Sequence, residues 1–191
     1  MSLTPSTMME LGTRAPDFAL PDVRTGQLVS LDNFDDSKGL LVLFICAHCP
    51  FVKHIEAELA RIENDYPDLG IIGICSNDEE NYPDDTPEKL AEQAERVGFD
   101  FPYCHDGSQE TAKAYRAACT PDLFLFDDDL KLVYRGQLDD SRPGNDLPVT
   151  GADLRAAINA LLGGEPITED QYPAVGCNIK WKPGNEPDYF G

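Results

Sequence analysis

The hydrophobic and polar positions predict a strand, a helix and a second strand in the first half of the chain. Residues 40–45 form a continuous apolar run, which is typical of a strand covered on both faces. After Pro50, apolar residues recur every three or four positions, as an amphipathic helix requires. Residues 70–75 form the next apolar run. This order predicts a β-α-β unit with a parallel sheet.

Shorter patterns on either side of this unit predict the other elements. Residues 18–20 and 28–31 flank a Thr-Gly turn signal and predict two short paired strands. Residues 123–126 and 132–134, joined by three aspartates at 127–129, predict an antiparallel hairpin. Further helices are expected from a cap at Thr86 to Gly98, from a cap at Ser108 through Tyr115, and from Thr150 and Asp153 to Gly163 and Gly164.

The end of the chain lacks these patterns. It contains Pro166, Pro173, Pro183, Pro187 and the only tryptophan, Trp181. We interpret it as an irregular tail packed over the domain. The expected organisation is an N-terminal segment at 1–11, one α/β domain at 12–163 and the tail at 164–191.

Charge and composition restrict the partners. The chain has 191 residues, 41% of them hydrophobic, and 15 Lys and Arg against 35 Asp and Glu give a net charge of −20. Such a charge repels phosphate backbones and anionic lipids, so we expect neither nucleic acid nor membrane partners. The longest apolar run, 40–47, is too short to cross a bilayer, and the first twenty residues lack a signal pattern. We therefore expect a cytoplasmic protein, with the acidic runs 78–80 and 127–129 as solvated loops.

Six cysteines, at 46, 49, 75, 104, 119 and 177, are too few for a disulfide-built scaffold. Cys75 and Cys104 lie in strand-like surroundings and are interpreted as small buried hydrophobic residues. Cys46 and Cys49 form a Cys-Ala-His-Cys motif directly after the predicted strand and before Pro50. The local setting of this pair makes it the candidate for chemistry.

A thiol reacts as its thiolate, which the N-terminus of a helix stabilises. The spacing of Cys46 and Cys49 puts one sulfur a turn away from the other, where it can resolve a mixed disulfide. His48, when protonated, would add positive charge that tunes the pKa of the pair. A metal site would need further ligands, and the other cysteines and histidines show no ligand-like spacing, so no metal residue is assigned.

The motif and its surroundings resemble the thioredoxin superfamily. The residues that carry the resemblance are Phe-Ile-Cys-Ala-His-Cys-Pro at 44–50 and Thr-Pro-Asp-Leu-Phe-Leu-Phe-Asp at 120–127. The peroxiredoxin-like branch, the alkyl hydroperoxide reductase and thiol-specific antioxidant (redoxin) proteins, is the most similar. The resemblance implies a thioredoxin-like fold over 12–163, with a mixed sheet flanked by helices and an N-terminal β-hairpin extension. It also implies a cis bond before Pro121, and substrate contacts by Thr120 and Pro121.

Departures from the family pattern bear on the reaction. Peroxiredoxins resemble Pro-x-x-x-Thr-x-x-Cys-Pro, and aligning their Cys-Pro with Cys49 puts Cys46 in the place of the threonine and Val42 in the place of the proline. Their arginine falls near Pro121. Copper chaperones of the superfamily resemble Cys-x-x-x-Cys-Pro, in which the cysteines are one residue further apart than here.

The sequence thus predicts a thiol-disulfide oxidoreductase that uses Cys46 and Cys49 and needs no cofactor. Its partners would be a protein or small-molecule disulfide and a reductant that the sequence does not name. The alternatives are a thiol peroxidase, with Cys49 attacking and Cys46 resolving, and a copper-binding protein. For disulfide substrates we favour an exposed, attacking Cys46 over a buried Cys49, although Pro50 gives Cys49 the N-cap position. Cys119 and Cys177 are candidate accessory thiols.

Overall fold

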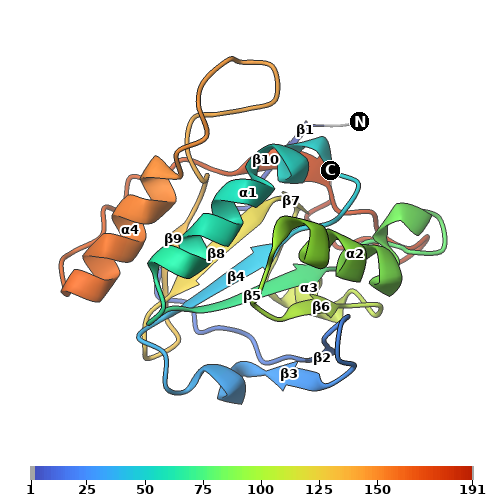
Figure 1. Cartoon of the computed structure of the whole chain (residues 1–191), viewed down its shortest axis with the longest axis horizontal. Coiled ribbons are helices and arrows are strands. Elements are labelled where there is room, and N and C mark those ends of the chain that lie inside the picture. The colour runs from blue at the N-terminus through green and yellow to red at the C-terminus, as the bar shows by residue number, and fades with distance from the viewer. Residues whose placement is uncertain (1–2, 191) are drawn as a thin grey trace.

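A five-stranded mixed sheet forms the centre of the molecule (Figure 1). The structure is a computed structural model and describes residues 3–190. Its strand order is β6-β5-β4-β8-β9. The strands are β4 (Leu40–Phe44), β5 (Gly70–Cys75), β6 (Tyr103–His105), β8 (Asp122–Phe126) and β9 (Leu132–Arg135). β4, β5 and β6 are parallel to one another, β8 runs antiparallel to β4, and β9 runs antiparallel to β8. The predicted β-α-β unit and the late hairpin are both confirmed.

Both faces of the sheet are covered, which explains the uninterrupted apolar run of β4. Leu41 and Leu43 pack in one core cluster, and Leu40, Val42 and Phe44 pack in the other. This alternation follows from the two-residue repeat of a strand. The first cluster lies under α1 (Pro50–Asp65), α2 (Pro87–Val97) and α4 (Ala152–Gly163). The second lies under α3 (Glu110–Ala114) and the hairpin of β2 (Ala19–Pro21) and β3 (Leu28–Ser30).

The predicted helices are present, with shifts of one residue at two of their starts. α2 has Thr86 at its N-cap and ends at Gly98, as predicted. The N-cap of α3 is Gln109 rather than Ser108, and that of α4 is Gly151 rather than Thr150. In both cases the predicted hydroxyl still accepts a hydrogen bond from the first N–H of the helix, at 3.3 Å. The predicted caps thus lie one position before the observed N-cap residues.

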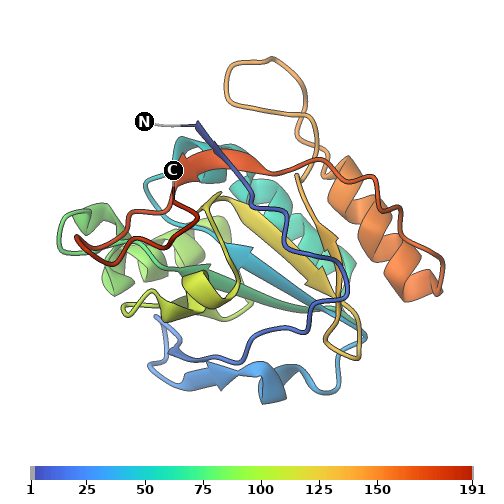
Figure 2. The same ribbon diagram turned by 180° about the vertical axis from the view of Figure 1, so that it is seen from behind.

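The two ends of the chain meet in a separate sheet that the sequence did not predict. β10 (Val175–Asn178) pairs antiparallel with β1 (Leu3–Pro5) on one side and with β7 (Cys119–Thr120) on the other. Figure 2 shows the blue N-terminal strand and the red C-terminal strand lying together beside α1. The prediction of a wholly irregular tail was therefore wrong at β10. The rest of the tail is irregular, and Trp181 packs in the second core cluster.

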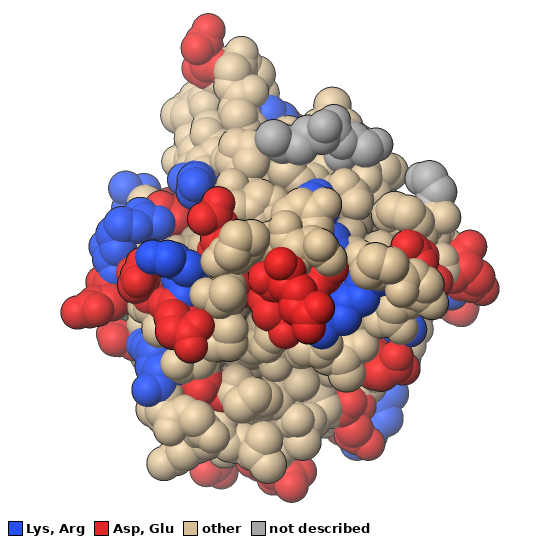
Figure 3. Space-filling model, turned by 90° about the vertical axis from the view of Figure 1, so that its right-hand side faces the viewer, with Lys and Arg blue, Asp and Glu red and all other residues tan. Residues whose placement is uncertain are grey.

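The surface reflects the acidic composition. Figure 3 shows the side of the molecule that carries α2, where acidic side chains gather near the middle and basic ones lie among them. One acidic position differs from the expected solvated loops, because Asp78 is 2% exposed. No helix within residues 3–190 has the length and apolarity needed to cross a membrane.

Candidate active site

Cys46 and Cys49 lie where β4 gives way to α1. Cys49 is the N-cap residue of α1, with an extended backbone, and Pro50 is the first residue of the helix. A proline suits that position because it has no N–H to leave unpaired. Both cysteines are 0% exposed. The expectation of an exposed Cys46 is therefore wrong, because the side chains of His48, Thr120 and Gln93 lie against this residue.

The loop before β8 brings Thr120 and Pro121 against the two cysteines. The Thr120–Pro121 bond is cis, as predicted. In its protonated form the Cys49 thiol donates a hydrogen bond to the Thr120 carbonyl oxygen at 3.2 Å, and the Thr120 hydroxyl lies 3.6 Å from the Cys46 sulfur. The structure thus brings together the four residues at 46, 49, 120 and 121 that the sequence selected from two distant segments.

Hydrogen bonds make Cys49 the acidic member of the pair. Its pKa is lowered to about 4, chiefly because the Cys46 thiol donates a hydrogen bond to the Cys49 sulfur, and this outweighs the burial that would raise it. The Thr120 hydroxyl, the Cys177 thiol and the Val52 N–H donate to the same sulfur. The Val52 N–H belongs to the first turn of α1, where helix N–H groups are unpaired.

Cys46 has the opposite electrostatic environment. Burial raises its pKa well above that of an ordinary thiol, and the hydrogen bond it donates to Cys49 and the negative charge of Asp85 raise it further. The two sulfurs therefore share one proton in a defined way: it stays on Cys46 and leaves Cys49. This division gives the N-cap cysteine the thiolate.

Asp85 fixes the backbone between the cysteines, and the sequence did not single it out. One carboxylate oxygen accepts hydrogen bonds from the N–H groups of Ala47 and His48, at 2.9 and 3.0 Å. The other accepts from the Asn77 amide at 2.7 Å and pairs with the His48 ring. Burial would raise the pKa of Asp85, but its hydrogen bonds from His48 and Asn77 lower it. Its neighbours in the acidic loop are exposed, and no pattern distinguishes it from them.

His48 is oriented by this carboxylate rather than by Cys49. Its ring nitrogen Nδ1 contacts Asp85 and lies 3.8 Å from the Cys46 sulfur, and its ring stacks on Tyr82. The groups that lower the pKa of Cys49 are the hydrogen-bond donors around it. The tuning role of His48 stays a prediction.

The two accessory cysteines occupy different positions. Cys119 precedes Thr120 on β7, and successive side chains of a strand point to opposite faces, so Cys119 and Thr120 face opposite sides of β7. Its thiol donates to the Pro121 carbonyl oxygen at 3.4 Å, and burial raises its pKa. Cys177, on β10, is the cross-strand partner of Thr120 and is hydrogen-bonded to Cys49. The structure therefore brings Cys177, and not Cys119, to the site.

One group of potential metal ligands lies in this region. The Cys46 sulfur, the His48 Nδ1 atom and a carboxylate oxygen of Asp85 all lie within 4.8 Å of one another. The histidine and the carboxylate are already paired, and Asn77 donates to the same carboxylate. A cation here would have to replace these hydrogen bonds.

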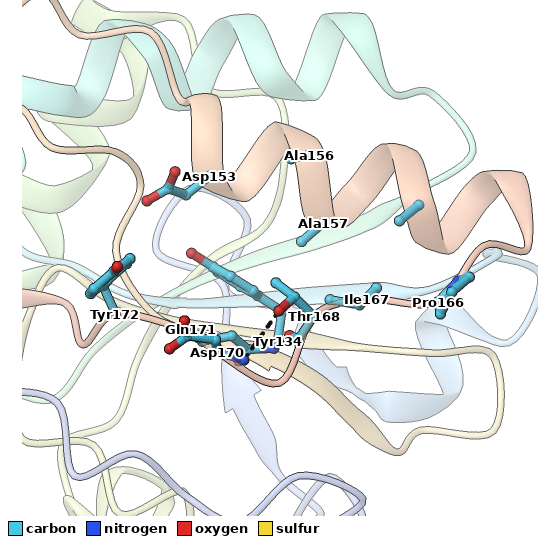
Figure 4. Close-up of a pocket in the computed structure, with 11 residues that line it drawn as sticks. Tyr134, Asp153, Ala156, Ala157, Pro166, Ile167, Thr168, Asp170, Gln171 and Tyr172 are labelled. Atoms are coloured by element: carbon cyan, nitrogen blue, oxygen red, sulfur yellow. Dashed lines mark hydrogen bonds between the residues drawn. The ribbon is translucent and has the colours of Figure 1, made fainter.

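A cavity of 360 Å³ lies elsewhere, between α4 and the tail (Figure 4). Tyr134, Ala157 and Ile167 form apolar parts of its wall, and Asp153 lies at one side. No cysteine lines it. This cavity is therefore separate from the cysteines at 46 and 49.

Comparisons with known proteins show which family the chain belongs to. The model of the AhpC/TSA family matches residues 11–135. An uncharacterized conserved protein from Geobacillus kaustophilus is 53% identical, with 96% of this chain and 98% of that one covered and a TM-score of 0.94. A hypothetical protein from Sinorhizobium meliloti 1021 is 50% identical, with 95% and 100% covered and a TM-score of 0.93.

More distant structures share the fold. Peroxidoxin BcpB from Mycobacterium tuberculosis is 20% identical, with 81% of this chain and 97% of that one covered and a TM-score of 0.62. At this identity the likeness concerns the fold, and it confirms the thioredoxin-like architecture that the sequence motifs implied. The comparison with curated proteins found no match.

Proposed function

Because the chain belongs to the AhpC/TSA family, we propose that it is a thiol-disulfide oxidoreductase with Cys46 and Cys49 as its redox pair. The observation that carries the proposal is the Cys49 sulfur at the N-cap of α1, with its pKa lowered to about 4. A thiol with that pKa is a thiolate at neutral pH, which is the form that attacks a disulfide. This assigns the first attack to Cys49, in place of the Cys46 that the sequence favoured.

The reaction has two exchange steps. The Cys49 thiolate attacks one sulfur of a substrate disulfide, so that a mixed disulfide forms and the other half leaves as a thiolate that takes up a proton. Cys46 then loses its proton and attacks the Cys49 sulfur, which releases the second half of the substrate as a thiol. The products are two substrate thiols and a disulfide between Cys46 and Cys49. A thiol reductant completes the cycle by reversing this oxidation.

The surrounding residues position these steps. The carbonyl oxygen of Thr120 contacts the Cys49 sulfur, and its hydroxyl contacts the Cys46 sulfur. We assign Thr120 and Pro121 to substrate contact. Asp85 holds the loop between the cysteines, so that Cys46 keeps its place beside Cys49. Such preorganisation reduces the entropy lost in the second attack.

Reaction with oxidised glutathione tests the proposal. Reduced protein should release two glutathione molecules per chain and end with a Cys46–Cys49 disulfide, identified by mass spectrometry of the unreduced digest. Cys46→Ser should keep the first release, and Cys49→Ser should lose it. If glutathione release survives in Cys49→Ser but is lost in Cys46→Ser, Cys46 is the attacking sulfur. Cys104→Ser is the matched control, since Cys104 lies in β6 away from the pair.

A thiol peroxidase is the second candidate, and the burial of Cys49 favours it. A sulfur with no exposed area is reached more easily by a small peroxide than by a folded protein. The thiolate would attack the peroxide, yielding a sulfenic acid at Cys49 and water or an alcohol, and Cys46 would then form the disulfide with loss of water. The hydrogen bonds that lower the pKa of Cys49 come from no arginine, which argues against strong peroxide activation. Comparing the rates with hydrogen peroxide and glutathione disulfide decides between the two reactions.

Copper binding is tested separately, because it would use Cys46, His48 and Asp85. Copper added to reduced protein should leave the ultraviolet spectrum of the thiolate unchanged if the hydrogen-bonded arrangement holds. A stable copper-thiolate band that Asp85→Asn removes would favour the metal-binding alternative.

A further inference from the structure

The edge of β7 beside the redox pair is filled by the chain itself. Cys177 and Asn178 of β10 pair antiparallel with Thr120 and Cys119. β1 covers the other edge of β10, so that β10 is the middle strand of its sheet (Figures 1 and 2). An extended peptide that binds by strand addition uses an open edge. β10 therefore has the position and direction of a bound strand, but it is covalently part of the protein.

Gly176 lets β10 approach this closely. A β-carbon at Gly176 would lie 2.0 Å from the Thr120 carbonyl oxygen and 2.7 Å from its carbonyl carbon. It would also lie 3.2 Å from Cδ of Pro121. No side chain fits at those distances, so the two backbones meet directly. Glycine is required here by space and not by its backbone angles, since the contact is to main-chain atoms that cannot rotate away.

The next residue, Cys177, faces the reactive sulfur. Directly paired residues of neighbouring strands have side chains on the same face, and Cys177 is paired with Thr120, whose hydroxyl and carbonyl contact Cys46 and Cys49. The Cys177 thiol donates a hydrogen bond to Cys49. Cys177 is 2% exposed, so this contact is shielded from water.

We propose that Cys177 is a third thiol of the exchange centre, held on β10 in the place of a substrate cysteine, and that it forms a disulfide with Cys49. This inference rests on the proposed function, because it needs Cys49 as the reacting sulfur. It adds a second internal partner for Cys49 beside Cys46.

The exchange needs no external electrons. In the oxidised protein Cys177 loses its proton and its sulfur attacks Cys49. The Cys49–Cys177 bond forms as the Cys46–Cys49 bond breaks, and Cys46 leaves as a thiolate that takes up a proton. One disulfide is thereby moved among three thiols, and the reverse attack by Cys46 restores the first pair.

The first experiment asks where the disulfide forms when Cys46 is absent. Cys46→Ser protein is oxidised with one equivalent of diamide and digested without reduction. We expect the Cys49–Cys177 peptide pair to be the main linked product. A main product that joins Cys49 to Cys119, or joins two protein molecules, would overturn the proposal.

Wild-type protein treated in the same way separates this proposal from the function on which it rests. If wild type forms Cys46–Cys49 and the Cys46→Ser protein does not form Cys49–Cys177, only the further inference fails. If wild type forms no disulfide at Cys49, the proposed function fails as well. If both disulfides form in wild type, the exchange among three thiols is supported.

The second experiment prevents the close contact between β10 and Thr120 without replacing Cys49 or Cys177. In the Cys46→Ser background, Gly176→Ala should reduce the yield of the Cys49–Cys177 disulfide at least tenfold, because β10 can no longer lie against Thr120. With Cys46 present, Gly176→Ala should still form the Cys46–Cys49 disulfide as its main product. Gly163→Ala is the matched control, since its nearest neighbouring atom would be 3.8 Å away. An unchanged Cys49–Cys177 yield in Gly176→Ala would show that β10 does not present Cys177.

Discussion

Cys49 and Cys104 are both 0% exposed, yet their thiols differ in acidity. Cys104 lies within β6, and burial raises its pKa to about 12. Cys49 lies at the N-cap of α1, and hydrogen bonds lower its pKa to about 4. Burial removes water from both sulfurs, but only the end of the helix and the loop around it replace water with donors.

The same contrast separates two buried carboxylates. Asp85 and Asp122 are both 0% exposed. Burial raises the pKa of Asp122 to about 6, whereas the partners of Asp85 hold its pKa below the ordinary value. Exposure is therefore a poor guide to reactive groups in this protein. Both carboxylates accept hydrogen bonds, but Asp85 also faces the His48 side chain, whose charge lowers the pKa of Asp85 further.

The largest expected effect is on thiolate titration. Reduced wild type should show one thiolate titrating near about pH 4, against about 8.5 for an ordinary thiol, a difference of about 6 kcal/mol. Ultraviolet absorbance of the thiolate measures this directly. Cys49→Ser should remove the transition and Cys104→Ser should leave it in place. A transition that persists without Cys49 would refute the contrast between the two thiols.

The rate of glutathione release should depend on the Cys49 thiolate. Cys49→Ser should reduce the rate of glutathione release about 10⁴-fold, equivalent to about 5 kcal/mol, because a serine hydroxyl is no nucleophile at neutral pH. Cys104→Ser should stay within about twofold, because that side chain lies in a strand interior without a role in exchange. Initial rates from free-thiol detection measure both. Equal losses of rate in the two variants would mean that the reactivity of a cysteine depends on its burial and not on its position at the helix end.

Asp85→Ala should destabilise the fold far more than the same change at the neighbouring, exposed Asp84. It removes the acceptor of the Ala47 and His48 N–H groups and of the Asn77 amide, and each buried donor without a partner costs about 1–3 kcal/mol. We expect the free energy of unfolding to fall by about 4 kcal/mol at neutral pH. The difference should shrink in acid, because a carboxyl group with a lowered pKa stabilises the fold only while it is charged.

Urea denaturation at several pH values measures this effect. Asp84→Ala is the neighbouring control, since Asp84 is exposed and should tolerate the change. A loss of stability equal to that of Asp84→Ala would show that the carboxylate does not hold the loop.

Asp122→Asn should show a smaller effect with the opposite dependence on pH. The folded state binds the Asp122 proton more tightly than the unfolded chain, with a pKa of about 6. Its stabilising contribution is present below about pH 4 and is lost as the pH rises through about 6, a change of about 3 kcal/mol. The Asn variant lacks this loss. The free energy of unfolding of wild type should therefore fall relative to that of the variant between these pH values. Parallel pH profiles of the two proteins would contradict the raised pKa.

Much of the fold could be predicted because its elements have local signals. The apolar run of β4 and the repeat of α1 are visible in the sequence, and Thr86 and Gly98 mark the ends of α2. β10 and β1 carry no such signal, since each is short and gains its hydrogen bonds only from distant strands. A strand of this kind is defined by its partner and not by its own residues.

The site could be predicted as far as its chemistry depends on a motif. Cys46 and Cys49 were found by their spacing, and Thr120 and Pro121 by resemblance. Asp85 was missed because its function depends on pointing inward from an acidic loop, which composition does not reveal. The preference for Cys46 as the attacking sulfur assumed an exposed first cysteine, and part of the cover over Cys46 comes from side chains far along the chain.

The place of β10 also affects the order in which the site is completed during synthesis. β10 follows every other strand and helix in the chain, yet it lies between β1 and β7. While the ribosome is still adding the tail, the cysteine loop and the Thr120–Pro121 turn already exist. At that stage the Cys49 sulfur lacks the neighbouring β10. Arrival of the last strand ends this interval, so the timing of translation sets how long Cys49 stays without this neighbour.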